Sequence, residues 1–158
     1  MDISVQEIYG NRLRIRVCGI CVVDDSILLI NHSGLNEGPF WAPPGGGMEF
    51  GHSAQENLAR EYREETGLEV QVEEFIFATE FIRDPLHAIE LFFSVRPTGG
   101  ALQAGHDPEM AKSKQLIQEA RLMTFQQIDA LPLPMKHGAF GLSAGSGRIR
   151  ELNGYFRI

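Results

Sequence analysis

The chain has 158 residues, of which 43% are apolar and 22% charged, a composition typical of a globular protein with one sizeable core. Its formal net charge of −7 and its pI of about 5.2 argue against broad binding to nucleic acid backbones. No stretch approaches the ~20 apolar residues of a membrane helix, and the first ten residues lack the basic, apolar run of a secretory signal. We therefore expect one cytoplasmic domain over residues 1–158, with neither membrane nor nucleic acid as a partner.

The predicted elements begin with a strand from Arg12 to Asp24, a turn at residues 24–26 and a second strand over residues 27–32, which together form a hairpin. Residues 33–40 have the composition of a loop. Two prolines and three glycines in residues 41–47 exclude a regular helix or a central strand there.

Two cysteines, Cys18 and Cys21, lie in the first strand as a C-x-x-C pair. Such a pair allows a redox or zinc role. In a strand, however, residues i and i+3 point to opposite faces, and the chain has no second pair to complete a zinc site. We expect two buried strand thiols.

The clearest helix spans about Ser53 to Thr66. Ser53 and Glu56 form an S-x-x-E capping box at its start, and Gly67 supplies a left-handed cap at its end. Residues four apart form an apolar stripe that faces the core, namely Ala54, Leu58 and Tyr62.

Strands are predicted over residues 68–83, 87–96 and 119–125, with a polar loop at 99–114. A second capping box, Thr124 with Gln127, starts a short helix to about Leu131. The tail from about residue 136 is rich in glycine, with a final strand near 154–158. These elements predict a mixed α/β domain in which helices cover a sheet.

Three carboxylates, Glu61, Glu64 and Glu65, fall within an arc of about 100° on the long helix, beside its apolar stripe. Their mutual repulsion would be relieved by a divalent cation such as Mg²⁺, which prefers carboxylate oxygens and substrate phosphate. Arg60 can orient one carboxylate, and the Gly45–Gly47 loop lets the backbone approach a cation or a phosphate. The alternative is a solvated acidic helix face.

Residues 46–68, GGMEFGHSAQENLAREYREETGL, resemble the Nudix box of the MutT-type pyrophosphohydrolases, G-x5-E-x7-R-E-U-x-E-E-x-G-U, in which U is a bulky aliphatic residue. The agreeing positions are Gly46, Arg60, Glu61, Glu64, Glu65, Gly67 and Leu68. Two positions depart from the box: His52 stands where glutamate is expected, and Tyr62 where an aliphatic residue is expected. Tyr62 is interpreted as a packing variation on the core stripe.

The resemblance implies an α+β fold, a Nudix-like α/β/α sandwich with a mixed β-sheet between helices. It also implies a hydrolase that cleaves a diphosphate linkage in a nucleoside diphosphate derivative by metal-activated water. Glu64, Glu65 and the carbonyl of Gly45 would bind Mg²⁺, or Mn²⁺ as the alternative. Glu61 would bind a second metal or position the water, with Arg60 holding it.

The glutamate that His52 replaces supports the metal site in the family. A histidine there could form a hydrogen bond or favour a softer cation such as Mn²⁺; the plainer interpretation is an exposed histidine before a helix. A general base would come from a later loop or strand. Glu119 and Glu109 are the first candidates, followed by Asp107 and by Glu90, which is otherwise interpreted as facing solvent on an open sheet face.

Four further questions stay open at this point. Phe40 and Trp41 could stack on a nucleobase or belong to the core, and Arg12, Arg14 and Arg16, which alternate along one strand face, could meet phosphate. A homodimer could form through the early strands or the C-terminal segment. The nucleotide substrate is not identified by the fold.

Two other functions compete with the hydrolase. One is a Nudix-fold module that binds a nucleotide or sugar nucleotide without cutting it, which His52 favours and the intact Arg60 to Glu65 run disfavours. The other is isomerisation of an isoprenoid diphosphate, which needs an active-site cysteine and is disfavoured by the early-strand position of Cys18 and Cys21.

Overall fold

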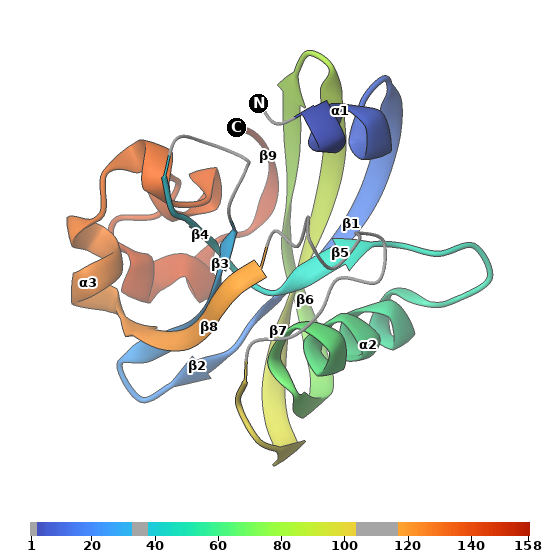
Figure 1. Cartoon of the computed structure of the whole chain (residues 1–158). Helices are drawn as coiled ribbons and strands as arrows, with labels where there is room; N and C mark the ends of the chain where they lie inside the picture. Colours follow the sequence, from blue (N-terminus) through green and yellow to red (C-terminus); the bar gives the residue numbers. More distant parts are fainter. Residues whose placement is uncertain (1–2, 33–37, 104–116) are drawn as a thin grey trace.

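The computed structural model of the protein describes residues 3–32, 38–103 and 117–158 (Figure 1). Its α-helices are α1 (Ile3–Tyr9), α2 (Ala54–Thr66) and α3 (Phe125–Ala130), and its 3₁₀ helices are η2 (Leu133–Met135), η3 (Gly138–Gly141) and η4 (Ser146–Glu151). Within those three ranges, every helix is too short or too polar to cross a membrane.

The strands form two sheets, and their bounds are β1 (Arg12–Ile20), β2 (Val22–Val23), β3 (Ser26–His32), β4 (Phe40–Ala42), β5 (Gly45–Gly47), β6 (Leu68–Arg83), β7 (Leu86–Gly100), β8 (Ile117–Thr124) and β9 (Gly154–Arg157). The large sheet has the order β5-β1-β7-β6-β9 and is mixed: β1 and β7 are parallel, as are β6 and β9, while the other pairs are antiparallel. In the small antiparallel sheet, β3 pairs with β8 and also with β2 and β4.

The predicted first strand is interrupted at Cys21, where the chain passes from the large sheet to the small one. β1 pairs with β7, and after the break β2 pairs with β3 in the predicted hairpin. Cys18 packs in the cluster between the two sheets, whereas Cys21 packs in the cluster beneath α2. Both cysteines are free and buried, so the prediction of buried thiols is confirmed. Only Cys18 lies in a strand, and the prediction of one continuous strand is wrong.

Apolar residues fill the space on both faces of the large sheet. On one face Phe77 and Phe92 stack with ring centroids 4.4 Å apart, against side chains of the small sheet and α3. On the other face Val17 and Phe93 pack against Leu58 of α2. Figure 1 shows the resulting layers, with α2 on one side of the large sheet and the small sheet with α3 on the other. The predicted sandwich around a mixed sheet is confirmed.

Helix α2 has the predicted limits. Ser53 and Glu56 form the capping box, and Gly67 adopts the left-handed conformation with φ 76°. Tyr62 is fully buried, and its hydroxyl donates to the carbonyl of Gly19 at 2.7 Å. A Cβ on Gly19 would lie 2.5 Å from the Tyr62 ring, so the tyrosine fits because glycine stands opposite it.

The remaining elements agree with the predictions except in three places. β6 spans residues 68–83, α3 begins with the Thr124–Gln127 capping box, and β9 lies at 154–157. β7 is longer than expected, α1 was not predicted, and the proline- and glycine-rich stretch contains the short strands β4 and β5. Both strands lie at sheet edges, where the missing side chains of the glycines are tolerated, and the two prolines fall between them. Most of the predicted polar loop falls outside the described residues.

Candidate active site

The carboxylates of α2 reach the glycine strand β5 at the edge of the large sheet. The Gly45 N–H donates to Glu65 Oε2 at 3.3 Å, and Glu65 is only 5% exposed. A Cβ placed on Gly46 would lie 2.4 Å from the carboxyl carbon of Glu61. Glycine is therefore required at Gly46 for Glu61 to lie against this strand.

Arg60 lies at the centre of the acidic cluster. Its Nη2 is 2.9 Å from Glu61 Oε1, its Nε is 3.8 Å from Glu64 Oε1, and its Nη1 forms an ion pair with Glu49. Burial raises the pKa of Glu61 above its ordinary value, and the charge of Glu64 adds to this while Arg60 opposes it. The cluster is thus partly desolvated and repulsive within itself.

The fit of this cluster to a divalent cation can be judged from its donor atoms. No three His, Cys, Asp or Glu side chains converge on a metal position within the described part of the chain, because Glu61 and Glu64 face Arg60 while Glu65 accepts from Gly45. The donors are nevertheless carboxylate oxygens beside a glycine strand, the chemistry that Mg²⁺ and Mn²⁺ favour. A cation would also relieve the repulsion between Glu61 and Glu64, which adds to the effect of burial on the pKa of Glu61. The residues fit the ion, and their roles as ligands stay a prediction.

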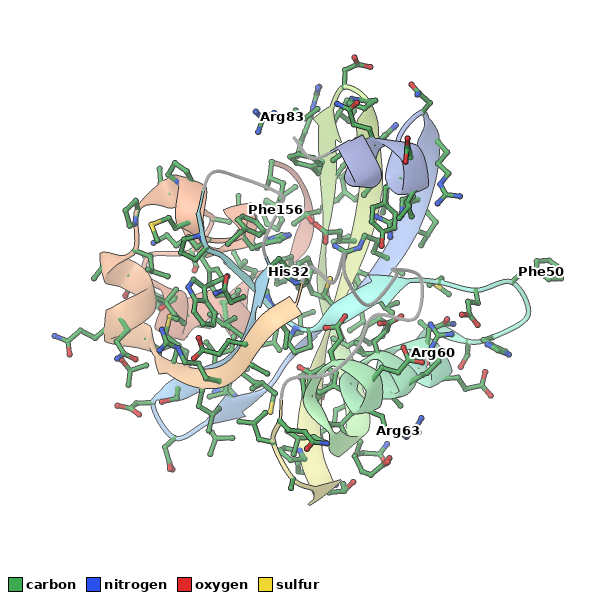
Figure 2. The ribbon with its side chains drawn as sticks, in the orientation of Figure 1. His32, Phe50, Arg60, Arg63, Arg83 and Phe156 are labelled. Atoms are coloured by element: carbon green, nitrogen blue, oxygen red, sulfur yellow. The ribbon has the colours of Figure 1, made fainter. Side chains whose placement is uncertain are left out.

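Residues 48–53 connect β5 to α2 and carry the departure from the Nudix box. His52 is exposed, with its Nδ1 3.4 Å from Glu49 Oε2. Position 52 lacks a carboxylate, but Glu49 in the same connection supplies one that pairs with Arg60. Figure 2 shows Phe50 at the tip of this connection, pointing away from the body of the protein.

Asn57, which sequence reasoning did not single out, anchors the same connection. It is fully buried on α2, its Oδ1 accepts from the Glu49 N–H at 2.9 Å, and its Nδ2 donates to the Ser53 carbonyl at 2.7 Å. An asparagine inside a helix is usually solvated, so the sequence contains no signal for this role.

The candidates for a general base are only partly described. Glu119 lies on β8 opposite Asn31, half-buried, with its Oε1 3.5 Å from Arg121 Nε. β8 also comes into contact with α2. Glu109 and Asp107 lie outside the described residues. The role of Glu119 as the general base remains a prediction.

Glu90 does not face solvent, which corrects the expectation from its strand position. It is 3% exposed on β7, 2.5 Å from Arg16 Nη1 and 2.7 Å from His137 Nε2. Burial alone would raise its pKa, but His137 and Arg16 outweigh this and hold the pKa well below its ordinary value. A carboxylate whose oxygens already accept several hydrogen bonds is a poor proton acceptor, so Glu90 is not a candidate base.

The aromatic and arginine residues that were candidates for contacting a substrate lie in different environments. Trp41 is 4% exposed and packs in the core, with the Arg121 guanidinium 4.5 Å from its ring centroid, so the core interpretation is confirmed for Trp41. Arg12 donates to the Ile8 carbonyl and Arg14 lies 4.1 Å over the Tyr9 ring. Of the three alternating arginines, only Arg16 reaches the buried Glu90.

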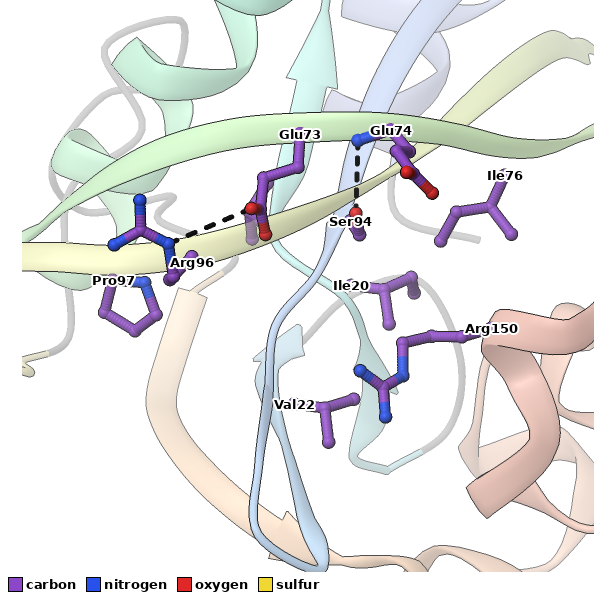
Figure 3. Close-up of a pocket in the computed structure, with 10 residues that line it drawn as sticks. Ile20, Val22, Glu73, Glu74, Ile76, Ser94, Arg96, Pro97 and Arg150 are labelled. Carbon is purple, nitrogen blue, oxygen red and sulfur yellow. Dashed lines mark hydrogen bonds and ion pairs between the residues drawn. The ribbon is translucent and has the colours of Figure 1, made fainter.

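A separate pocket lies where Ile20 and Val22 face the bulged part of β6 and η4 (Figure 3). One of its two arginines is paired, because Arg96 Nε is 3.8 Å from Glu73 Oε2. The backbone N–H of Glu74 donates to the Ser94 hydroxyl at 3.2 Å. No predicted site residue among those described lines it. We therefore do not assign the chemistry to this pocket.

Comparison with known proteins identifies the family. The NUDIX domain model matches residues 12–143 of the chain. The chain therefore belongs to the Nudix hydrolase family, and the matched region contains the α2 carboxylates and the β5 glycines described above.

Relatives and solved structures agree with this assignment. The chain is 37% identical over 103 residues to an ADP-ribose pyrophosphatase of Methanocaldococcus jannaschii, a match covering 62% of this chain and 59% of that one. It is 31% identical over 130 residues to the human 8-oxo-dGDP phosphatase NUDT18, covering 79% and 37%. A Nudix hydrolase from Nitrosomonas europaea has a similar fold, with a TM-score of 0.67 at 20% identity, covering 80% and 81%. A UDP-X diphosphatase superposes with a TM-score of 0.65 at 20% identity, covering 92% and 67%.

Replacing Gly46 with alanine is expected to displace Glu61 without unfolding the protein. The new Cβ would collide with a carboxylate at the end of a flexible side chain rather than with backbone, so the side chain can turn away. We expect a thermal midpoint close to that of the native chain and weaker uptake of Mn²⁺ measured by calorimetry. Gly38→Ala is a poor control because of its positive φ; Gly99→Ala, with no close neighbour, is the matched control. Unchanged Mn²⁺ affinity would show that Glu61 is not placed by Gly46.

Proposed function

We propose that the chain is a divalent-metal-dependent hydrolase that cleaves a diphosphate linkage in a nucleoside diphosphate derivative. The observation that carries this proposal is the approach of Glu61 and Glu65 to the glycine strand β5, with Glu64 beside them on Arg60. Membership of the Nudix family supports it, as do relatives named for ADP-ribose and 8-oxo-dGDP.

The roles proposed here are those that the resemblance to the Nudix box implies for these residues. Glu64, Glu65 and the Gly45 carbonyl would hold Mg²⁺ or Mn²⁺, and Glu61 would complete the site or orient the attacking water. When bound, the cation neutralises phosphate charge and lowers the pKa of the attacking water. Arg60, which lies within ion-pair distance of both Glu61 and Glu64, would offset their mutual repulsion and orient them. Glu119 is the proposed general base among the described residues.

Substrate identity can be tested with a panel of ADP-ribose, a UDP-sugar, 8-oxo-dGDP, a dinucleoside polyphosphate and coenzyme A. We expect phosphate or nucleoside monophosphate release from at least one compound with Mg²⁺ or Mn²⁺, and none in excess chelator. A control without protein measures spontaneous hydrolysis, and the chelator tests whether the remaining, enzymatic release needs the metal. Release that is unaffected by chelator would contradict the metal-dependent proposal.

A binding module is the second candidate, and His52 is the observation that favours it. Position 52 carries an exposed imidazole instead of a carboxylate. If the native chain binds one of these compounds tightly but releases nothing with either metal, the module is the better description.

A further inference from the structure

The guanidinium of Arg16 is held by one buried carboxylate, that of Glu90. Arg16 on β1 and Glu90 on β7 are directly opposed in the parallel pair, so their side chains share one face of the large sheet. Arg16 Nη1 lies 2.5 Å from Glu90 Oε2. A guanidinium has five donors, and this contact uses one of its nitrogens.

Glu90 is in turn immobilised by donors from three other parts of the chain. His137 Nε2 lies 2.7 Å from Oε1, Thr79 Oγ1 lies 3.4 Å from the same oxygen, and Cys18 Sγ lies 3.5 Å from Oε2. The Ala139 N–H donates to His137 Nδ1 at 3.1 Å, so Nδ1 carries no proton and Nε2–H donates to Glu90. This arrangement fixes Glu90 as an acceptor that holds Arg16.

The remaining face of the Arg16 guanidinium is not used by the described residues. Its Nε is buried and has no acceptor among them, while the side chain as a whole is 24% exposed and hence reachable from outside. Burial alone would lower the pKa of Arg16, but the charges of Glu90, Glu65 and Glu61 raise it above its ordinary value. The guanidinium is therefore permanently charged. Arg16 also stands opposite Gly47 in the β1–β5 pair, and the two preceding glycines of β5 lie against Glu61 and Glu65.

The neighbouring histidine adds no competing charge. Burial, followed by the positive charge of Arg16, lowers the pKa of His32 to about 3. The imidazole is thus neutral at physiological pH and cannot form an ion pair with an anion beside Arg16. In Figure 2 His32 lies between the small sheet and the large one.

We propose that Arg16 binds a non-bridging phosphate oxygen of the substrate, and that Glu90, held by His137, is the positioning residue that aims the guanidinium. This inference rests on the proposed function, because the cation at Glu61 and Glu65 would bring the diphosphate beside Arg16. Arginine suits the role because its planar donors match two phosphate oxygens at once.

The test compares Arg16→Met with Arg12→Met, which removes an equal charge from the same strand face. The probe is imidodiphosphate, a non-hydrolysable diphosphate, titrated by calorimetry into each protein in the presence of Mg²⁺. Arg16→Met should weaken probe binding and raise KM by about 10- to 100-fold, the range for losing a charge-assisted hydrogen bond. Arg12→Met should change neither by more than about twofold. Arg16→Lys should recover part of the loss.

A double-mutant cycle tests the positioning role of Glu90. Glu90→Gln should raise KM several-fold in the native chain but have no further effect on KM in the Arg16→Met background, because its effect passes through Arg16. A merely structural role would give additive effects. The Arg16→Met/Glu90→Gln protein also avoids an unpaired buried charge, and its thermal midpoint shows whether the fold is intact.

The outcomes separate this inference from the proposed function. Turnover with unchanged KM and unchanged probe affinity in Arg16→Met overturns the role of Arg16 alone. Probe binding by the native chain that needs Arg16, without turnover of any compound, supports Arg16 and contradicts the hydrolase. Failure of the native chain to bind the probe with Mg²⁺ overturns the inference.

Discussion

Replacing Glu65 with glutamine is expected to lower turnover by at least about 10²-fold, because the amide cannot supply the negative charge that holds the cation. Glu65 is buried and already accepts from the backbone of Gly45, and glutamine preserves its shape and that hydrogen bond. The fold should therefore survive the change. Turnover is measured with the compound that the substrate panel identifies, and Mn²⁺ affinity is measured by calorimetry on the same protein.

Glu69→Gln is the matched control for this experiment. Glu69 is an exposed glutamate that pairs only with Arg63 at 2.9 Å among the contacts described, so its loss should leave turnover and Mn²⁺ affinity within about twofold. Full activity in Glu65→Gln would remove Glu65 from the proposed metal ligands. If Glu65→Gln lost activity but kept the native Mn²⁺ affinity, Glu65 would contribute to turnover by something other than binding the metal.

Replacing Glu90 with alanine is expected to lower the free energy of unfolding by about 3–5 kcal/mol, the usual result of removing one partner from a buried ion pair. Arg16 would keep its buried charge, and the His137 N–H would lose its acceptor. Urea denaturation followed by circular dichroism measures the change. Arg16→Met/Glu90→Leu, which removes both charges, should be much less destabilised. A loss below about 1 kcal/mol in Glu90→Ala would contradict this account.

The same carboxylate predicts how stability depends on pH. The pKa of Glu90 in the folded protein lies below its ordinary value of 4.5, so its contribution is present above about pH 4.5 and is lost as the pH falls below it. Glu90→Gln, which cannot ionise, should lose less stability between pH 6 and pH 3 than the native chain. Parallel pH profiles of unfolding would contradict the assignment.

Local sequence was sufficient wherever a structural signal is completed within a few residues. The capping boxes at Ser53 and Thr124 and the left-handed cap at Gly67 predicted both ends of α2 and the start of α3. The spacing of Glu61, Glu64 and Glu65 likewise predicted a common helix side, and Glu61 and Glu65 on that side lie against β5.

Features that depend on remote residues could not be predicted in this way. The break at Cys21 follows from which sheet each half of the strand joins, and that is decided by β7 and β3. Glu90 seemed suited to an open sheet face because its partners Arg16 and His137 lie 74 and 47 residues away in the sequence. The role of Asn57 depends on a loop whose path the sequence does not specify.

The contact between Tyr62 and Gly19 constrains how this protein can have diverged from relatives with an aliphatic residue in the box. With tyrosine at position 62, any side chain at position 19 would clash with the tyrosine ring. With leucine at position 62, a cavity would remain unless position 19 carried a larger residue that filled it. We expect either substitution alone to lower the stability of the fold. Across homologous chains we expect glycine at 19 to accompany tyrosine at 62, and larger residues at 19 to accompany aliphatic ones.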